Sequence, residues 1–311
     1  MNNNNDSNFI NSLSKLNLND GCKQLMNLVK NNANIELIKQ QIILGADINY
    51  KNKNGYNILM IACINKNYEV VKLLLENNVL IDNNRVNNNY NINSDSALML
   101  SVNNIDILKL LIKYKSNVNY QNVMGYTALM KACLNKNLDS VKLLIENKAN
   151  LNALNKLNES ALSLSCDIYN NSEIIEYLIL SGANINNVDY FGNTPIYNLC
   201  CNYINIHNKI RLIKLFISNG CNINHKNEKN ESIIDYGYNQ VYFSIEIFKF
   251  LILYGCEYNK NIKYIDKYNV ELYLNSKQYL KDYYDYHIEK SALLFSKMVL
   301  LSDDYLKIKE L

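Results

Sequence analysis

The residues best able to do chemistry in this sequence are its eight cysteines and three histidines. A zinc site or a redox centre usually contains two cysteines separated by two other residues, and the sequence holds no such Cys-x-x-Cys pair. The cysteines recur instead at small-residue positions of repeated segments, where close packing favours a small apolar side chain. We therefore expect reduced thiols and no metal site. The recurring residues are Cys63, Cys133, Cys166 and Cys200 in one segment, and Cys221 and Cys256 in another.

The histidines and glycines form no catalytic pattern. His207, His225 and His287 are scattered, and no Ser or Cys nucleophile motif accompanies them. Neither of the glycine-rich loops that hold phosphates, G-x-x-x-x-G-K and G-x-G-x-x-G, occurs in the chain. A row of lysines could form a phosphate track, but most of them follow an acidic residue by three positions, which favours a solvated helix face. We predict a protein that is not an enzyme and needs no cofactor.

Composition and charge narrow the class of protein further. The chain has 311 residues, a net charge of +3 and no block of like charge, so nothing calls for nucleic acid as a partner. Asn makes up roughly a fifth of the residues, a bias that A/T-rich codons explain. The first residues lack a signal-peptide pattern, and no window reaches the roughly 18 apolar residues of a membrane span. We expect a cytoplasmic, or alternatively nuclear, monomer that binds neither membrane nor nucleic acid.

Two segments recur along the chain and supply the elements that position side chains. One of them occurs seven times, and each copy carries apolar residues at helical spacing, such as Val70, Val71 and Leu74. An acidic residue usually opens the copy, where it suits the positive end of the helix dipole. The copies are IELIKQQIILGADIN (35–49), YEVVKLLLENNVLID (68–82), IDILKLLIKYKSNVN (105–119), LDSVKLLIENKANLN (138–152), SEIIEYLILSGANIN (172–186), IRLIKLFISNGCNIN (210–224) and IEIFKFLILYGCEYN (245–259).

The other segment begins with a residue that can cap a short helix. A Thr, Ser or Asn opens each copy, and its side-chain oxygen can accept a hydrogen bond from the first helical turn. Successive copies are 39, 31, 33, 34 and 38 residues apart. Together the two segments predict helix pairs that stack into a continuous core. The capping positions are Asn57, Ser96, Thr127, Ser160, Thr194 and Ser232.

The spacing and the phrases Thr127-Ala128-Leu129-Met130 and Thr194-Pro195-Ile196-Tyr197 resemble the ankyrin repeat family, whose period is about 33 residues and whose signature is T-P-L-H-x-A. The resemblance implies an all-α ankyrin solenoid, in which a β-hairpin-like finger follows each helix pair. The His of the signature is replaced, so we expect its hydrogen bonds to be missing. The replacements are Met60, Met99, Met130, Ser163, Tyr197 and Asp235.

The repeats divide the chain into three parts. Residues 1–20 are expected to be a disordered Asn-rich leader, residues 21–261 an array of about seven units, and residues 262–311 a helical C-terminal cap or docking segment. The finger that contains residues 83–93 is six residues longer than the regular ones, and we expect an enlarged, mobile loop there. The unit that begins at Thr194 has a longer turn between its helices, CNYINIHNK, at residues 201–209.

The family resemblance also implies that a partner protein binds along the finger tips and the exposed edge of the first helices. The tips in the middle of the array are apolar or aromatic and add nothing to the helix core, as expected of an interface. The alternative is that some of them pack sideways onto neighbouring fingers. Tyr126 and Phe191 are the expected anchors. The candidate contact set is Tyr56, Val123, Met124, Tyr126, Leu157, Tyr190 and Phe191.

Two functions follow from this interpretation. The first is a non-catalytic scaffold for protein–protein interaction, bound on the finger and inner-helix face of the array. The second is a substrate-recruiting adaptor for a ubiquitin ligase that acts through the C-terminal segment. Some viral ankyrin proteins end in an F-box, but its Leu-Pro opening is absent here because Pro195 is the only proline.

Overall fold

The computed structural model describes residues 18–82, 94–169, 171–202, 204–238 and 244–257. These residues form paired helices joined by loops, and an isolated bridge between Lys51 and Asn57 is the β-structure found among them. The predicted all-α fold is confirmed. The chain divides into two compact units, residues 1–195 and 196–311. The expected C-terminal segment 262–311, most of the leader and the enlarged loop at 83–93 lie outside the described residues.

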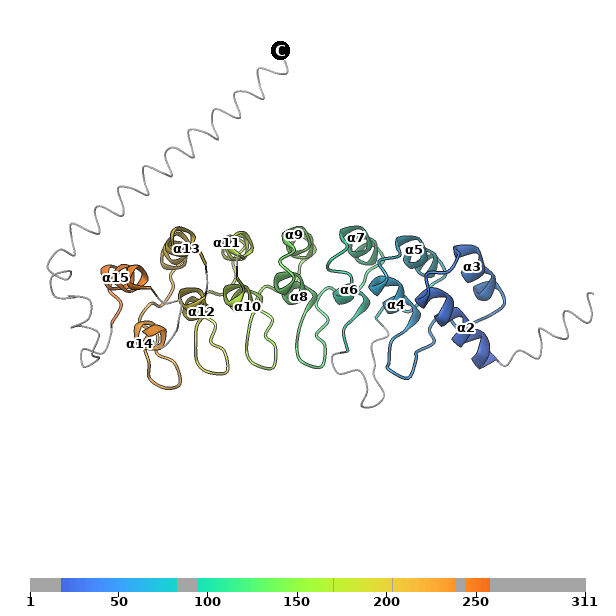
Figure 1. Cartoon of the computed structure of the whole chain (residues 1–311), viewed down its shortest axis with the longest axis horizontal. Helices are drawn as coiled ribbons and strands as arrows, with labels where there is room; N and C mark the ends of the chain where they lie inside the picture. The colour runs from blue at the N-terminus through green and yellow to red at the C-terminus, as the bar shows by residue number, and fades with distance from the viewer. Residues whose placement is uncertain (1–17, 83–93, 170, 203, 239–243, 258–311) are drawn as a thin grey trace, which may run out of the picture. The chain divides into compact units, whose positions relative to one another are not determined.

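The first unit stacks five helix pairs in two rows (Figure 1). One row holds the second helix of each pair, the other holds the first, and long loops extend beyond the first-helix row. Helix α2 begins at Leu18, three residues before the expected start of the array, with Asp20 suited to the dipole of its first turn. The pairs are α2 (Leu18–Lys30) with α3 (Ile35–Ile43), α4 (Ile58–Ile64) with α5 (Tyr68–Glu76), α6 (Ala97–Leu100) with α7 (Ile105–Lys113), α8 (Ala128–Leu134) with α9 (Leu138–Glu146), and α10 (Ala161–Asp167) with α11 (Ser172–Leu180).

The core lies between successive pairs, on the helix faces that the apolar spacing predicts. In α5, the side chains of Val70, Val71 and Leu74 are buried. Leu37 of α3 stands at the position that corresponds to Val70, but it is 47% exposed, because the described residues contain no helix pair before that of α2 and α3. Burial of the apolar face thus depends on a neighbouring unit, as expected when one helix pair cannot enclose a core alone.

The predicted helix caps are present at four positions of this unit. Each of these side chains accepts a hydrogen bond from the backbone N–H three residues later. Thr194 differs, because its buried hydroxyl has no hydrogen-bond partner among the described residues. The four caps are Asn57, Ser96, Thr127 and Ser160.

Asparagine side chains join the repeats at recurring positions. Asn67, Asn104 and Asn137 cap the second helices α5, α7 and α9. A second set forms a ladder, in which a side-chain oxygen near the start of one finger accepts the backbone N–H of the corresponding segment in the next repeat. The rungs of the first unit are Asn49 to Leu80 (2.8 Å), Asp82 to Asn117 (3.0 Å), Asn119 to Asn150 (2.7 Å) and Asn152 to Asn184 (2.8 Å).

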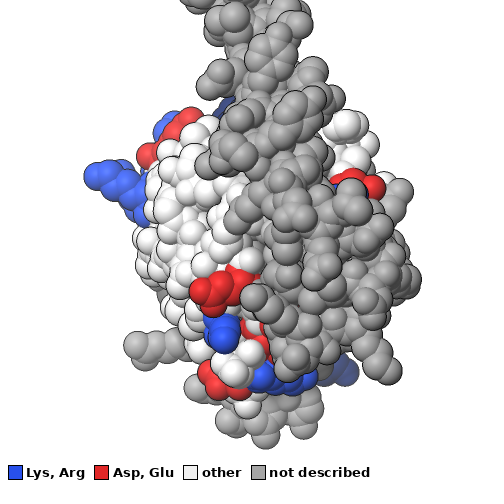
Figure 2. Space-filling model, turned by 90° about the vertical axis from the view of Figure 1, so that its left-hand side faces the viewer, with Lys and Arg blue, Asp and Glu red and all other residues white. Residues whose placement is uncertain are grey.

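The second unit holds two helix pairs, with one rung of the same ladder from Asn224 to the N–H of Glu257 (2.8 Å). Helix α13 begins at Ile206, where Asn205 accepts the N–H of His207, so part of the expected long turn is helical instead. On the described surface that Figure 2 shows, from the side of α14 and α15, acidic and basic side chains lie next to one another. The pairs are α12 (Pro195–Cys201) with α13 (Ile206–Ser218) and α14 (Ile233–Tyr238) with α15 (Ile245–Leu253).

One expectation about the signature histidine is wrong for this unit. The Tyr197 hydroxyl, at the histidine position, donates to the carbonyl oxygens of His225 (2.5 Å) and Glu231 (3.0 Å). A hydrogen-bonded link from the first helix to the finger is therefore kept in another chemical form. Met60, Met99 and Met130 are buried at this register in the first unit, where they add apolar packing instead.

Candidate partner-binding surface

The thiols are placed for packing. No disulfide joins any of the eight cysteines, all of which the structure describes, and those at the recurring helix position are buried, as predicted. Burial raises the pKa of Cys133 to about 12, against an opposing hydrogen bond with Ser165, so the reactive thiolate is suppressed at neutral pH. Among the described residues, no cluster of His, Cys, Asp and Glu could hold a metal ion.

The fingers share one hydrogen-bonding plan that fixes their tips. The fingers are numbered along the chain, so the first contains Asn52, the second residues 83–93, the third Asn122, the fourth Asn155 and the fifth Asp189. In the third finger, the Asn122 side-chain oxygen accepts the N–H groups of Met124 (3.0 Å) and Tyr126 (2.9 Å). The backbone closes the same turn, because Gly125 N–H donates to the Asn122 carbonyl at 2.8 Å. The same pattern is centred on Asn52, Asn155, Asp189 and Asn227 in the other described fingers. The two residues after this Asn or Asp form the tip of each finger.

The tips of three consecutive fingers expose apolar side chains. We call this surface the apolar strip. Tyr190 and Phe191 are the most exposed of its members, at 66% and 61%, and their rings meet edge to face with centroids 5.5 Å apart. The strip consists of the tip residues Val123, Met124, Leu157, Tyr190 and Phe191, together with Leu154 and Val188, which stand directly before the Asn or Asp of their fingers.

Backbone contacts make the strip continuous along the first unit. The N–H of Lys156 donates to the Met124 carbonyl (3.0 Å), and the N–H of Tyr190 donates to the Leu157 carbonyl (2.8 Å). The fingers also approach closely at Gly125, where an added Cβ would lie 2.8 Å from Asn155 Cα. Neighbouring fingers therefore contact one another through the backbone, whereas the alternative expectation was that the tip side chains would pack sideways; these side chains remain exposed.

The strip overlaps the candidate contact set only in part. Leu154 and Val188 were not predicted, although they share a register at which Lys51 and Gln121 stand in other fingers. Apolar residues at a position that is polar in other fingers were the sequence signal that could have identified Leu154 and Val188 as candidates. Tyr56 is half-buried and lies in the first finger, which is separated from the strip in sequence by the enlarged finger.

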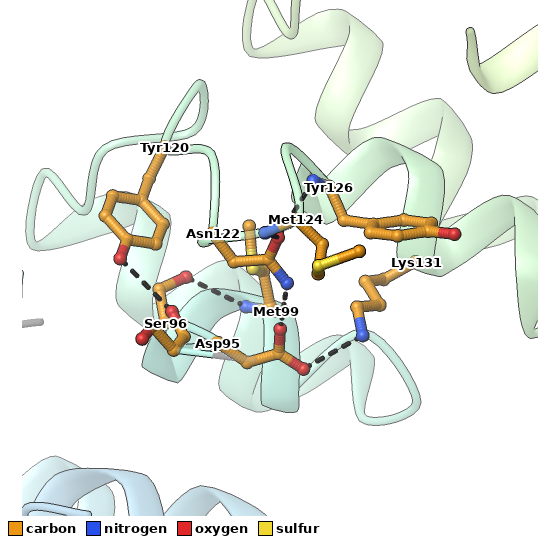
Figure 3. A network of polar contacts seen from close by, with 9 residues as sticks. Asp95, Ser96, Met99, Tyr120, Asn122, Met124, Tyr126 and Lys131 are labelled. Carbon is orange, nitrogen blue, oxygen red and sulfur yellow. Dashed lines mark hydrogen bonds and ion pairs between the residues drawn. The ribbon is translucent and has the colours of Figure 1, made fainter. Parts of the chain in front are cut away.

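Tyr126, one of the two expected anchors, takes part in an internal polar network (Figure 3). Its ring centroid lies 5.4 Å from the Lys131 ammonium, which forms an ion pair with Asp95 at 3.0 Å. The other oxygen of Asp95 accepts the Asn122 side-chain N–H at 2.6 Å. The Lys131 and Asp95 side chains are only 23% and 17% exposed. Tyr126 is half-buried and covers a neutralised charge pair.

A different charge arrangement follows one repeat later. Glu159 occupies the register of Tyr126 and of Asp95, and its carboxylate accepts the Asn155 side-chain N–H at 2.7 Å. Partial burial raises the pKa of Glu159, the Asn155 hydrogen bond opposes this rise, and the nearby negative charges of Asp167 and Asp189 add to it. In the described part of the chain, no basic nitrogen lies within 4.0 Å of these three carboxylates.

None of the helices in the described residues combines the length and the apolar character that crossing a membrane requires.

The comparisons with known proteins agree with the helix pairs and fingers. A sequence model described as "Ankyrin repeats (3 copies)" matches residues 25–122, 79–155, 96–189 and 162–262. A putative ankyrin repeat protein, L86 of Acanthamoeba polyphaga mimivirus, is 32% identical over 252 residues, which is 63% of this chain and 38% of that protein. The crystal structure of the human ASB11 ankyrin repeat domain matches 76% of this chain and 99% of its own with a TM-score of 0.60 and 16% identity, which shows a common fold. Because the family match extends over most of the sequence, this chain belongs to the ankyrin repeat family.

Proposed function

We propose that this chain binds its partner protein on the apolar strip of the third, fourth and fifth fingers. Ankyrin repeats are scaffolds for protein–protein interaction, and the family is typically non-catalytic. The observation that supports this location is the exposure of Tyr190, Phe191 and Leu157 side by side on fingers joined through their backbones. A contiguous exposed apolar surface of this kind marks an interaction site, and aromatic residues carry much of the binding energy at such sites.

The fixed shape of the fingers supports the same proposal. Each tip is held by two side-chain hydrogen bonds and a closed backbone turn, so little order has to be gained when a partner binds. A preorganised surface loses less conformational entropy on binding and therefore binds more tightly.

The test compares one variant with a matched control. The full chain, a Leu157→Ser, Phe191→Ser variant and a Leu180→Ser variant are used to recover partners, and the most enriched partner is purified for calorimetric titration. Leu180 is 68% exposed in α11 and lies outside the strip, so it controls for loss of an exposed apolar side chain. We expect the double variant to weaken binding at least roughly tenfold and the control to bind like wild type. Equal binding by all three proteins would place the interface elsewhere.

The ligase-adaptor function stays a prediction. It depends on residues 262–311, which lie outside the described residues. Deletion of that segment should abolish co-purification of ligase subunits if the prediction is right, and should leave binding at the apolar strip unchanged. A cytoplasmic or nuclear location and a monomeric state are likewise proposals, to be checked by microscopy and by light scattering.

A further inference from the structure

The charge pair beneath Tyr126 shows how this fold accommodates a cation beside its fingers. Asp95 stands directly before a helix cap, and the Lys131 ammonium reaches it from the first helix of the next repeat. Asn122 holds the carboxylate through its second oxygen, and the Tyr126 ring covers the ammonium (Figure 3). Carboxylate, amide and aromatic ring thus form a receptor for one basic side chain, which the chain fills itself.

Glu159 stands at the same register as Asp95, but no cation lies within 4.0 Å of it among the described residues. Glu159 also stands directly before a helix cap, and its carboxylate accepts the amide N–H of Asn155 in its own finger. Glu231 accepts from Asn227 in the same way, whereas Asp95 is held by Asn122 of the next finger. The register of Lys131 is occupied by Asn198 in the following repeat of the sequence, which is neutral. Two further carboxylates, Asp167 and Asp189, are close enough to act on Glu159 electrostatically.

Two exposed aromatic residues follow one of these carboxylates directly along the chain. Asp189 directly precedes Tyr190, and the N–H of Tyr190 is bonded to Leu157, two residues before Glu159. Exposed rings close to carboxylates suit a lysine or arginine, because the ring face attracts the cation and the carboxylate pairs with it. The negative charge borders the apolar strip, and no described residue of the chain supplies a basic nitrogen within 4.0 Å of it.

We propose that Glu159, with Asp167 and Asp189, receives a lysine or arginine side chain of a partner segment whose flanking apolar residues pack on Leu157, Tyr190 and Phe191. The occupant is a basic, apolar peptide segment. Its basic residue takes the part that Lys131 takes beside Asp95. This inference rests on the proposed function, because it identifies the chemistry of the segment that the apolar strip binds.

Short random peptides displayed on phage provide the probe. The library is panned on the full-length chain, and enriched peptides are synthesised with a fluorescent label for anisotropy titrations. We expect enriched sequences to carry a Lys or Arg between apolar residues. Glu159→Gln keeps an oxygen that can accept from Asn155 but removes the charge, and should weaken binding roughly tenfold. Glu146→Gln, an exposed change at the end of α9, should leave the affinity unchanged.

Peptide variants separate the inference from the proposed function. Replacing the peptide's basic residue by a neutral one of similar length should cost wild type as much as Glu159→Gln does, and should cost the variant little more. Peptides without a basic residue, or equal affinity for wild type and Glu159→Gln, would overturn the inference. If Leu157→Ser, Phe191→Ser still weakened binding in that case, the proposed function would stand. Peptides unaffected by any strip substitution would overturn both.

Discussion

Gly125→Ala tests whether the fingers pack as closely as the structure shows. Gly125 has a φ of +80°, a conformation that costs a residue with a side chain about 1–2 kcal/mol. The added methyl group would also lie 2.8 Å from Asn155 Cα and 3.1 Å from the Lys156 backbone nitrogen. Relief requires the fingers to separate, which strains the hydrogen bond from Lys156 to Met124 and costs about 1 kcal/mol more. We expect a total loss of about 2–3 kcal/mol.

Gly182→Ala is the matched control. Gly182 has a φ of +89°, and an added Cβ would meet no atom within 4 Å, so its substitution measures the backbone strain alone. Urea unfolding followed by circular dichroism gives both midpoints, with the slopes checked because stacked repeats can unfold in parts. We expect Gly125→Ala to lose about 1 kcal/mol more than Gly182→Ala. Equal losses would refute the close approach of the third and fourth fingers, and with it the continuity of the apolar strip.

Three further predictions test the buried thiols, the asparagine ladder and the internal charge pair. Because burial raises the pKa of the Cys133 thiol from 9.0 to about 12, the stabilising contribution of the protonated thiol is complete below pH 9 and is lost as the pH rises toward 12. Cys133→Ala removes this titration, so melting curves of the variant should show a free energy of unfolding that falls less steeply over this pH range, by about 1.4 kcal/mol per pH unit. Asn152→Ala should lose about 1 kcal/mol in urea unfolding, whereas Asn152→Asp keeps the acceptor for the Asn184 N–H and should lose less. A double-mutant cycle of Asp95→Asn and Lys131→Met should give a coupling energy of about 1 kcal/mol, since the pair is partly buried, and a value near zero would show that the pair adds nothing to stability.

The helix pairs could be predicted because each unit repeats the same local signals. A capping residue such as Thr127 and an apolar face such as that of α5 act within one turn of their own helix, so sequence spacing is enough to locate them. The rungs of the asparagine ladder could not be predicted, because Asn152 meets the N–H of Asn184 only after the repeats have stacked. The abundance of asparagine in the composition does not by itself explain why asparagine stands at these registers.

The exposure of the candidate site residues was predictable where it depends on their position in the repeat, and unpredictable where it depends on residues far away in the sequence. Tyr190 and Phe191 occupy the tip positions of a tight turn, whose geometry alone points them away from the helices. Tyr126 follows such a tip by two residues, and its surroundings depend on Lys131, a residue of the next helix that pairs with Asp95 of the previous finger. Three segments had to be assembled before that charge pair existed, and no spacing in the sequence marks it.

A repeat protein allows structural and functional residues to be separated within one chain, because every register is sampled several times. Where the fold needs a property at one position of the repeat, the repeats share that property. Asn158 replaces Gly125 yet keeps a positive φ of 57°, as the turn requires. Where the registers disagree, the fold tolerates the difference and another requirement can act. Asp95 has an internal cation, whereas Glu159, at the same register, has none among the described residues. The amide of Asn155 gives the Glu159 carboxylate a hydrogen bond within its finger, as Asn227 does for Glu231, but it does not neutralise the charge. A charge that no described residue neutralises, near aromatic side chains that the fold leaves exposed, matches the basic and apolar partner segment that we propose.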